Sequence, residues 1–470
     1  AMGPYDEMVF RTMIRDSAYI YDVVGLESEG TTVDFQVGTN SYLYGTRFIS
    51  YLAYEHGPDK LIHWVSDIEH RNSYFASHFK KVYGASLDEH WSEWIQWEKQ
   101  FQQANLDSIR EYPTTVYRPI SDRALGSVSR AHYDGESGLL YVAILYPGQT
   151  AHIAAIDIEK GTIEKIREVK GPGLYYVTSL AYDPDRQDLF YTTKNGSWRD
   201  LNILNLTTGK HKRLLKEERI GDLTFNQADQ SIWGVRHYNG ISTVVRIPPP
   251  YREWHQVYSF PYGKDIYDID LSPDGQLLVG ALSEPNGHQF LIGIHTDSLM
   301  KGNPTYKILF DFENSNPANF VFSGDGNYLY GSSYYSGVSN IYRYDLQEQD
   351  MDILSNCETG FFRPVPVSAD SLIAFRYTGQ GFYPVIMPIE VPERVGKSSS
   401  LGTQLVKKYP VLKSWILGTP TKLEPDSDIR FSGGYRPLRE IRLNSIFPIV
   451  EGYKEYAAFG VRLDFTDRIG

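Results

Sequence analysis

Apolar and polar positions alternate with a period of two along residues 130–392, and the alternation comes in six similar copies. Each copy runs from a short apolar segment through a polar turn into a second apolar segment. Successive turns open 43 to 51 positions apart, which is the room that four short strands and their connections need. Repeats of this length are typical of the blades of a β-propeller. The turns open at Asp134, Asp183, Asn226, Ser272, Ser323 and Ser368.

Other parts of the copies favour strands as well. Third strands are predicted at residues 153–158, 201–206 and 341–346, and each ends in a polar hairpin turn. The turns at 272–275 and 323–326 read Ser-Pro-Asp-Gly and Ser-Gly-Asp-Gly, and they resemble the short WD40-like repeat of the TolB-type propellers. This resemblance implies a propeller and says almost nothing about its ligand.

The predicted fold is therefore mainly β, with a six-bladed β-propeller over residues 106–392. Six blades against seven stays open, because residues 110–130 could complete another blade or supply a closing strand. A chain of 470 residues is too long for one ordinary core, so further domains are expected. We predict an all-α module over residues 1–105 before the propeller and a linker with a short β tail over residues 393–470.

The first hundred residues show the periodicity of amphipathic helices rather than strands. Leu61, Trp64, Val65 and Ile68, for example, lie at i, i+3, i+4 and i+7 and form one apolar stripe. Helices are expected over residues 6–23 and 41–55, from Gly57-Pro58, from about Asn72 to Gly84, and after a capping box at Ser86-Leu87-Asp88-Glu89.

The segment Ser41-Tyr42-Leu43-Tyr44-Gly45, followed by Tyr54-Glu55-His56-Gly57, resembles the part of gluzincin (peptidase MA-like) metallopeptidases downstream of their zinc site. The resemblance covers roughly residues 4–100 and implies the back half of a peptidase domain. In that family the tyrosine of a Tyr-x-x-Gly motif hydrogen-bonds the tetrahedral intermediate. The matching residue here is Tyr42, which would be catalytic only together with the missing half.

The zinc-binding part of that family is not in this sequence, which contains no His-Glu-x-x-His motif. Without two imidazoles and a carboxylate on one ion, no water can be activated. His56, His63 and His70 recur every seven residues, about 10 Å apart along a helix, which is too far to share an ion. We therefore expect no zinc ligands, no resident cofactor and no peptidase activity in this chain, while a parent protein could hold zinc.

Composition and charge narrow the partners. The formal net charge of −12 argues against nucleic acid, which binds clustered Lys and Arg. The 36 tyrosines suit a β-rich protein with wet aromatic surfaces. Cys357 is the single cysteine, so no internal disulfide can form, and we expect a buried, idle thiol. The opening Ala1-Met2-Gly3 is typical of a vector remnant on a fragment, so missing targeting signals carry no information.

Candidate ligand-binding residues follow from the propeller register. The first residue of each innermost strand should lie near one mouth of the central channel, and five of these six residues are polar. Asp268 and Asp270 should share one strand face by two-residue alternation. Such side chains could hold Ca²⁺, Mg²⁺, a peptide or a sugar, or they could simply be solvated. The predicted mouth residues are Arg130, Ser179, Asp222, Asp268, Asn319 and Pro364, together with Asp270.

The tail changes character again. Residues 391–404 read as a polar linker. Residues 456–465 alternate with period two and resemble the opening strand of an outer-membrane β-barrel, as in bacterial envelope proteins that join a peptidase-like domain, a TolB-like propeller and a barrel. A single strand cannot satisfy its own edge, so we expect it to pair elsewhere in the chain, for instance with a blade edge.

Two functions follow as hypotheses. The first is a non-catalytic binding and scaffold fragment of a bacterial cell-envelope protein, periplasmic or associated with the outer membrane. Its propeller would recognise a peptide, protein or glycan next to a metallopeptidase-like domain. The alternative is a hydrolase whose site is formed by carboxylates in the propeller channel, with Asp222, Asp268 and Asp270 as candidates.

Overall fold

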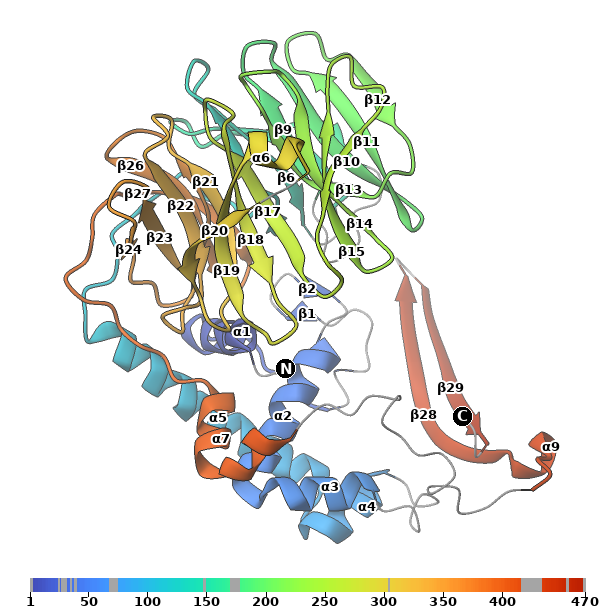
Figure 1. Cartoon of the computed structure of the whole chain (residues 1–470). Helices are drawn as coiled ribbons and strands as arrows, with labels where there is room; N and C mark the ends of the chain where they lie inside the picture. The colour runs from blue at the N-terminus through green and yellow to red at the C-terminus, as the bar shows by residue number, and fades with distance from the viewer. Residues whose placement is uncertain are drawn as a thin grey trace. The chain divides into compact units, whose positions relative to one another are not determined.

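The structure is a computed structural model, shown in Figure 1. It describes residues 3–23, 26, 32–33, 36–37, 40–66, 75–146, 149–169, 178–302, 305–415, 433–453 and 456–467.

The chain forms two compact units, and neither is one continuous stretch of sequence. One unit comprises residues 1–45 and 97–400, and the other comprises residues 46–96 and 401–470. This division runs through the predicted all-α module rather than at its end, and the predicted domain boundaries stay predictions.

In its described residues, the first unit is built around six antiparallel sheets. Their innermost strands follow one another in chain order, while the later strands of each sheet lie farther out (Figure 1). The fold is thus mainly β and a propeller, as predicted. The sheets, named from the innermost strand outward, are sheet 1 (β4 Ser127–Val128 and β5 His132–Asp134, β6 Leu139–Leu145, β7 His152–Asp157, β8 Ile163–Glu168), sheet 2 (β9 Leu180–Asp183, β10 Asp188–Asn195, β11 Trp198–Asn205, β12 His211–Leu215), sheet 3 (β13 Ile220–Phe225, β14 Ile232–Tyr238, β15 Ile241–Ile247, β16 His255–Ser259), sheet 4 (β17 Asp265–Leu271, β18 Leu277–Ser283, β19 Gln289–His295, β20 Tyr306–Asp311), sheet 5 (β21 Pro317–Phe322, β22 Tyr328–Ser333, β23 Asn340–Asp345, β24 Asp350–Ile353) and sheet 6 (β25 Phe361–Pro366, β26 Ser371–Thr378, β27 Gly381–Pro388, β3 Arg118–Pro119).

The core of this unit lies between the sheets rather than inside any one of them. Each apolar cluster combines side chains of two neighbouring sheets, as Trp233 of sheet 3 does with Ile266 and Leu278 of sheet 4. The last cluster joins Phe375 of sheet 6 to Leu140 of sheet 1, so the series of interfaces closes on itself. Because each sheet buries both faces against neighbours, the alternating apolar strands stabilise a closed ring.

A strand from before the ring completes its last sheet. β3 pairs with β27, with Arg118 opposite Ile386 and Pro119 opposite Val385. Of the two roles left open for residues 110–130, part of the segment therefore serves as a closing strand.

Helix α1 (Pro4–Arg15) packs on the end of the ring at which the innermost strands begin. Its Arg11 Nε donates to the Glu358 carbonyl oxygen, at 2.6 Å, in the loop before β25. At the same end of the ring, the hydroxyl of Tyr334 in the β22–β23 turn donates a hydrogen bond to Met8 Sδ of α1 at 3.4 Å. The predicted helix over residues 6–23 is too long, because Ser17 adopts a positive φ of 52° just beyond the last helical turn.

The other predicted helices are present with small shifts. α2 (Asn40–His56) and α3 (Pro58–Ser66) meet at Gly57, and α4 (Phe75–Tyr83) ends before Gly84, as the turn residues indicated. The predicted start of that last helix near Asn72 lies outside the described residues. The capping box opens α5 (Leu87–Arg110), because Ser86 N donates to Glu89 Oε2 at 2.7 Å and Glu89 N to Ser86 Oγ at 3.2 Å.

The remaining elements are short. The predicted all-α module also contains a two-residue ladder of β1 (Thr32–Val33) and β2 (Gln36–Val37), and α6 (Thr296–Met300) follows β19. The predicted linker to residue 404 is interrupted by α7 (Leu401–Lys408), which buries Leu401 and Leu405 one helical turn apart and leads into the 3-10 turn η2 (Pro410–Ser414).

The tail forms a hairpin of its own. A short helix, α9 (Pro437–Glu440), precedes β28 (Arg442–Tyr453), which pairs along its length with β29 (Tyr456–Thr466). The alternating strand at residues 456–465 is thus present, but its partner is β28 and not a blade edge. Apolar side chains on one face of this hairpin are largely exposed, including Val450 at 66% and Phe459 at 80%.

Candidate functional site: a polar cup at the ring end

The innermost strands of sheets 3 to 6 share one irregularity. Each carries a β-bulge at which two of its residues oppose a single residue of the next strand. The first residue of each bulge has a positive φ, between 46° and 51°. Non-glycine residues in this region cost on the order of 1–2 kcal/mol each. The four residues held this way are Asp222, Asp268, Asn319 and Arg363.

Small residues on the next strand make these bulges possible. Gly234, Gly280, Gly331 and Ala374 stand opposite the four bulges. A Cβ at Gly331 would collide with the ring of Phe320, which is the second bulge residue of β21. A Cβ at Gly280 would approach Ile269, the second bulge residue of β17, to 3.0 Å. The second bulge residue therefore packs into the core over a glycine, while the first turns its polar side chain toward the channel.

These side chains line one cavity of about 190 Å³, which we call the cup. Every sheet contributes to it. Sheets 1 and 2 supply residues at the start of their innermost strands, and sheets 3 to 6 supply the bulge residues. The cup is lined by Ser129, Arg130, Thr178, Ser179, Asp222, Leu223, Asp268, Ile269, Asn319 and Arg363.

The cup has a charged floor that spans the channel. Arg130 of sheet 1 reaches across to sheet 4, where its Nη2 contacts Asp270 Oδ1 at 2.6 Å and its Nη1 donates to the Ile269 carbonyl oxygen at 3.0 Å. Asp270 also accepts from Thr224 Oγ1 at 2.9 Å and from Phe322 N at 2.9 Å. Its side chain is only 10% exposed. Asp270 is therefore fully engaged in holding the ring together.

His132 lies beside this floor as a neutral group. Its Nε2 lies 3.2 Å from the Leu180 carbonyl oxygen. Burial, and next the positive charge of Arg130, lower the pKa of His132 to about 4. The imidazole thus adds no charge to the floor at neutral pH.

The wall of the cup is less completely paired. Asp268 Oδ2 accepts a hydrogen bond from Asn319 N at 3.0 Å, and Arg363 Nε donates to Asn319 Oδ1 at 3.1 Å. Burial, and then the neighbouring charge of Asp222, raise the pKa of Asp268 to about 6, although the Asn319 hydrogen bond, Arg363 and Arg130 act in the opposite direction. Burial lowers the pKa of Arg363. The wall thus holds a carboxyl group that titrates close to neutral pH.

A histidine at the rim connects the wall to a further carboxylate. His237 Nε2 lies 3.7 Å from Asp222 Oδ2, and His237 Nδ1 lies 3.4 Å from Asp265 Oδ1. These two acids raise the pKa of His237 to about 9, and the same contact lowers the pKa of Asp265. The rim histidine is therefore cationic at neutral pH and shares its charge between two aspartates.

The structure brings together five of the predicted mouth residues, namely Arg130, Ser179, Asp222, Asp268 and Asn319. Two predicted positions are corrected. The bulge formed by Arg363 and Pro364 places the side chain of Arg363, rather than Pro364, in the cup. The bulge at Asp268 breaks the expected two-residue alternation, so that Asp270 lies in the floor instead of on the wall. Left-handed bulges leave no signature in a period-two pattern, which is why Arg363 was missed.

The other candidate residues lie elsewhere. Tyr42 is on α2 with 79% of its surface exposed, and its catalytic role stays a prediction. Cys357 is buried as expected, and burial raises the pKa of its thiol. His56 packs its ring against that of His90 at 5.1 Å, while His70 lies outside the described residues. Within the described ranges, no three His, Cys, Asp or Glu side chains gather into a group that could hold a metal ion.

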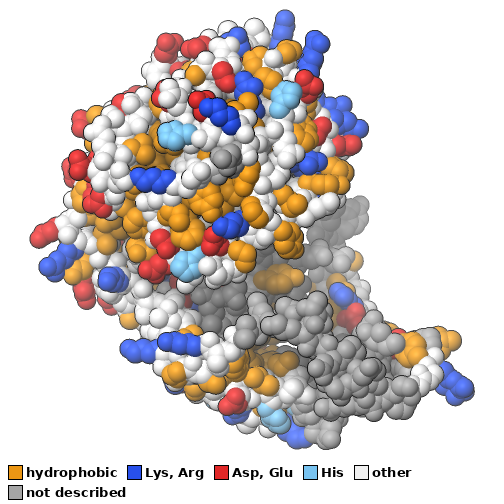
Figure 2. Space-filling view, in the orientation of Figure 1, with side chains coloured by type: hydrophobic (Ala, Val, Ile, Leu, Met, Phe, Trp, Pro, Cys, Tyr) orange, Lys and Arg blue, Asp and Glu red, His pale blue; other side chains and the backbone are white. Residues whose placement is uncertain are grey.

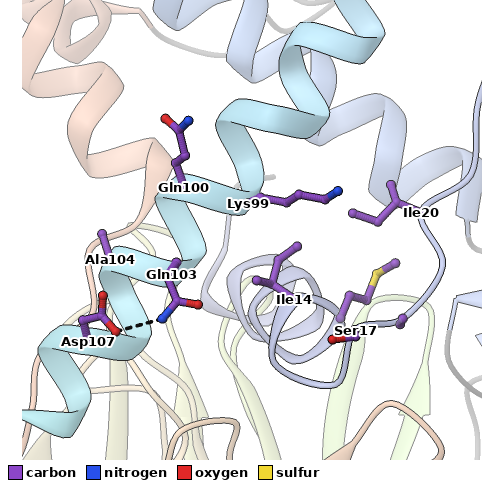
Figure 3. Close-up of a pocket in the computed structure, with 10 residues that line it drawn as sticks. Ile14, Ser17, Ile20, Lys99, Gln100, Gln103, Ala104 and Asp107 are labelled. Atoms are coloured by element: carbon purple, nitrogen blue, oxygen red, sulfur yellow. Dashed lines mark hydrogen bonds between the residues drawn. The ribbon is translucent and has the colours of Figure 1, made fainter.

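A second cavity lies beside the ring, between the end of α1 and the middle of α5 (Figure 3). Its volume is about 670 Å³, and aliphatic side chains such as Ile14 and Ile20 face polar ones on α5. Gln103 there donates to Asp107 at 2.8 Å. This cavity gathers no convergent set of polar groups comparable to the cup.

The charged side chains of the ring are mixed in sign. On the face shown in Figure 2, acidic and basic side chains are interspersed over the ring. Among the helices that the structure describes, none has both the length and the apolar character of a membrane span.

Comparison with known proteins gives structural likeness only. No family model and no curated protein matches the chain. Solved structures that are similar include TolB from Acinetobacter baumannii (15% identity, 57% of this chain and 65% of that chain covered, TM-score 0.38), an oligogalacturonate lyase from Vibrio parahaemolyticus (9%, 59% and 98%, 0.40) and a gluconolactonase from Xanthomonas campestris (14%, 59% and 94%, 0.44).

This chain thus spans about two thirds of the length of that TolB. Two of these three structures are named as enzymes. A fold by itself does not fix a function, which depends on the site.

Proposed function

We propose that this chain is a binding module whose cup receives the end of a peptide or glycan. The observation that carries the proposal is the row of four left-handed bulges. Four non-glycine residues hold a costly backbone conformation, and all four present polar side chains to the same cavity. Strain that recurs at equivalent positions of neighbouring sheets, always around one cavity, is typical of a functional site.

The size and the floor of the cup fit the end of a chain better than its middle. A volume of about 190 Å³ is below the roughly 300–1,000 Å³ of cavities that enclose drug-sized ligands. The Arg130–Asp270 pair spans the channel beneath it, which favours a ligand that enters from the ring end and stops there.

Calorimetric titration with short peptides and with oligosaccharides tests the proposal. We expect one of the two classes to bind, and Arg363→Gln to weaken it at least fivefold through loss of a donor in the cup. Arg343→Gln is the matched control, because Arg343 pairs with Asp352 on the outer strands of sheet 5. An unmodified protein that binds neither class would overturn the proposal.

A hydrolase remains the second candidate because of one observation. The carboxyl groups of Asp268 and Asp222 line the same small cavity, and a pair of carboxyl groups at one site is the usual arrangement of glycoside hydrolases. Turnover of glycoside reporters that disappears in both Asp222→Asn and Asp268→Asn would favour this candidate. Binding without turnover would favour the module.

The cellular setting belongs to the same proposal. The resemblance to envelope proteins suggests a periplasmic or outer-membrane-associated parent, with a peptidase-like part next to the propeller. In support, α1, which falls within the peptidase-like resemblance, packs on the ring end where the cup lies. Fractionation of cells that express the parent protein tests the setting, and recovery in the cytoplasm would contradict it.

A further inference from the structure

We propose that the wall formed by Asp222 and Asp268 is specific for a primary ammonium group, either the amino terminus of a peptide or a lysine side chain. The inference rests on the proposed binding function and names the chemistry of its ligand. It is carried by the geometry of the cup, in which two carboxylates of adjacent sheets face one small cavity.

The first argument is the pairing of the charges around the cup. Arg130 is engaged by Asp270, and Arg363 by Asn319. Among the described residues, no cationic group lies within ion-pair distance of Asp268. His237 approaches Asp222 only to 3.7 Å and shares its charge with Asp265. The carboxylates of Asp222 and Asp268 are therefore hydrogen-bond acceptors in the cup whose negative charge is only partly compensated by the described residues.

The second argument is the balance of charge. Among the described residues at the cup and its rim, four carboxylates, those of Asp222, Asp265, Asp268 and Asp270, stand against three cationic groups, those of Arg130, Arg363 and His237. A ligand cation would neutralise the excess, whereas a ligand anion would increase it. Burial makes this imbalance costly, since a partly desolvated charge interacts more strongly than one in water.

The third argument separates an ammonium from a metal ion and from a sugar. Ca²⁺ takes six to eight oxygen ligands, whereas the described residues offer no group of three acids here. A sugar carries no charge to offset the aspartates. An ammonium presents three donors, which match Asp222, Asp268 and the hydroxyl of Ser179, and the Arg363 guanidinium could then meet the carbonyl of the same ligand.

Titration of the unmodified protein with tetra-alanine, with its N-acetyl form and with N-acetyl-lysine amide tests the inference by calorimetry. We expect tetra-alanine to bind and N-acetylation to weaken binding at least tenfold. Binding of N-acetyl-lysine amide would show that a side-chain ammonium also suffices. Asp268→Asn should remove at least tenfold of the affinity, while Asp274→Asn, in an exposed turn, should leave it unchanged.

The pH dependence of ligand affinity gives a second test, because a residue with a purely structural role would not produce it. Asp268 must be ionised to hold an ammonium, so affinity should fall about tenfold from pH 7 to pH 5, and binding at pH 6 should release protons. The groups that face Asp268 and set this dependence are Asp222, Asn319, Arg363 and Arg130.

The outcomes separate this inference from the proposed function. Equal binding of tetra-alanine and its N-acetyl form, or binding of oligosaccharides alone, would overturn the ammonium inference and leave a binding module. Heat with Ca²⁺ or Mg²⁺ that disappears in Asp268→Asn would replace the ammonium by a metal ion. Absence of binding by any of these probes would overturn both.

Discussion

Two aspartates on the same strand, Asp268 and Asp270, have opposite surroundings. Asp270 is 10% exposed and bound by a guanidinium, a hydroxyl and a backbone N–H, so that its charge is fully compensated. Asp268 accepts one backbone hydrogen bond and stands beside another carboxylate, and its pKa rises to about 6. The floor of the cup is therefore built for stability, whereas the wall keeps unsatisfied charge. A charged group near a channel is a candidate for binding only if its own fold does not already compensate it.

The largest effect should come from breaking the floor. Asp270→Asn removes the charge that compensates Arg130, and loss of one partner of a buried pair costs about 3–5 kcal/mol. Urea unfolding should show this loss in the free energy of unfolding. Asp268→Asn, two residues away, should cost less than 1 kcal/mol. Equal losses in the two variants would remove the distinction between floor and wall.

The glycines behind the wall come next. Gly331→Ala forces a Cβ against the ring of Phe320, and overpacking of this kind costs about 1–3 kcal/mol. Gly293→Ala on β19 is the control, because its Cβ would meet only ordinary contacts at 3.5 Å. Thermal unfolding of both variants measures the difference. A Gly331→Ala protein as stable as the control would mean that the bulge at Asn319 does not depend on close packing.

A smaller effect concerns the pH dependence of the wall. The folded-state pKa of Asp268 lies above the unfolded value of 3.8, so the folded state binds the proton more tightly. Stability is therefore lost as pH rises from about 4 to about 6, by roughly 1–2 kcal/mol after screening at the partly exposed mouth. Asp268→Asn should abolish this dependence. Urea unfolding of both proteins between pH 4 and pH 7 tests the sign, and parallel curves would contradict it.

The smallest effect should come from the rim. The folded pKa of His237, about 9, lies above its ordinary value of 6.5. Its stabilising contribution is therefore complete below pH 6.5 and is lost as pH rises through 9. Since 41% of this side chain is exposed, we expect a contribution of about 0.5 kcal/mol or less. His237→Gln should flatten the unfolding free energy between pH 6.5 and pH 9, and NMR titration of the ring gives the pKa directly.

The sequence was sufficient for features that repeat or alternate. Period-two alternation and recurring turns predicted strands such as β7 and β23 nearly to the residue, and Gly84 and the Ser86–Glu89 capping box predicted helix ends. The same register predicted that Asp222, Asp268 and Asn319 lie together. These features are encoded locally, by side-chain periodicity and turn chemistry.

Features that depend on pairing between distant residues could not be predicted in this way. Asp270 pairs with Arg130, which lies 140 positions earlier, and nothing near either residue indicates it. Arg363 enters the cup because a left-handed bulge shifts its strand by one residue. Arginine has no preference for positive φ, so its presence in the sequence does not indicate such a bulge. The partner of β29 could not be predicted either, because its alternating pattern is compatible with several partner strands, and in the structure it pairs with β28.

The pairing of β3 with β27, which completes sheet 6, has a mechanical consequence. The chain enters the ring through β3 and leaves it after β27, and these two strands lie side by side in sheet 6. A pull applied between the parts of the chain before and after the ring would load this junction together with the hydrogen bonds of Asn105 and Ser108 to residues 397–399, and it would leave sheets 2 to 4 almost without tension. The ring should therefore open at its seam, at low force, long before its blades come apart.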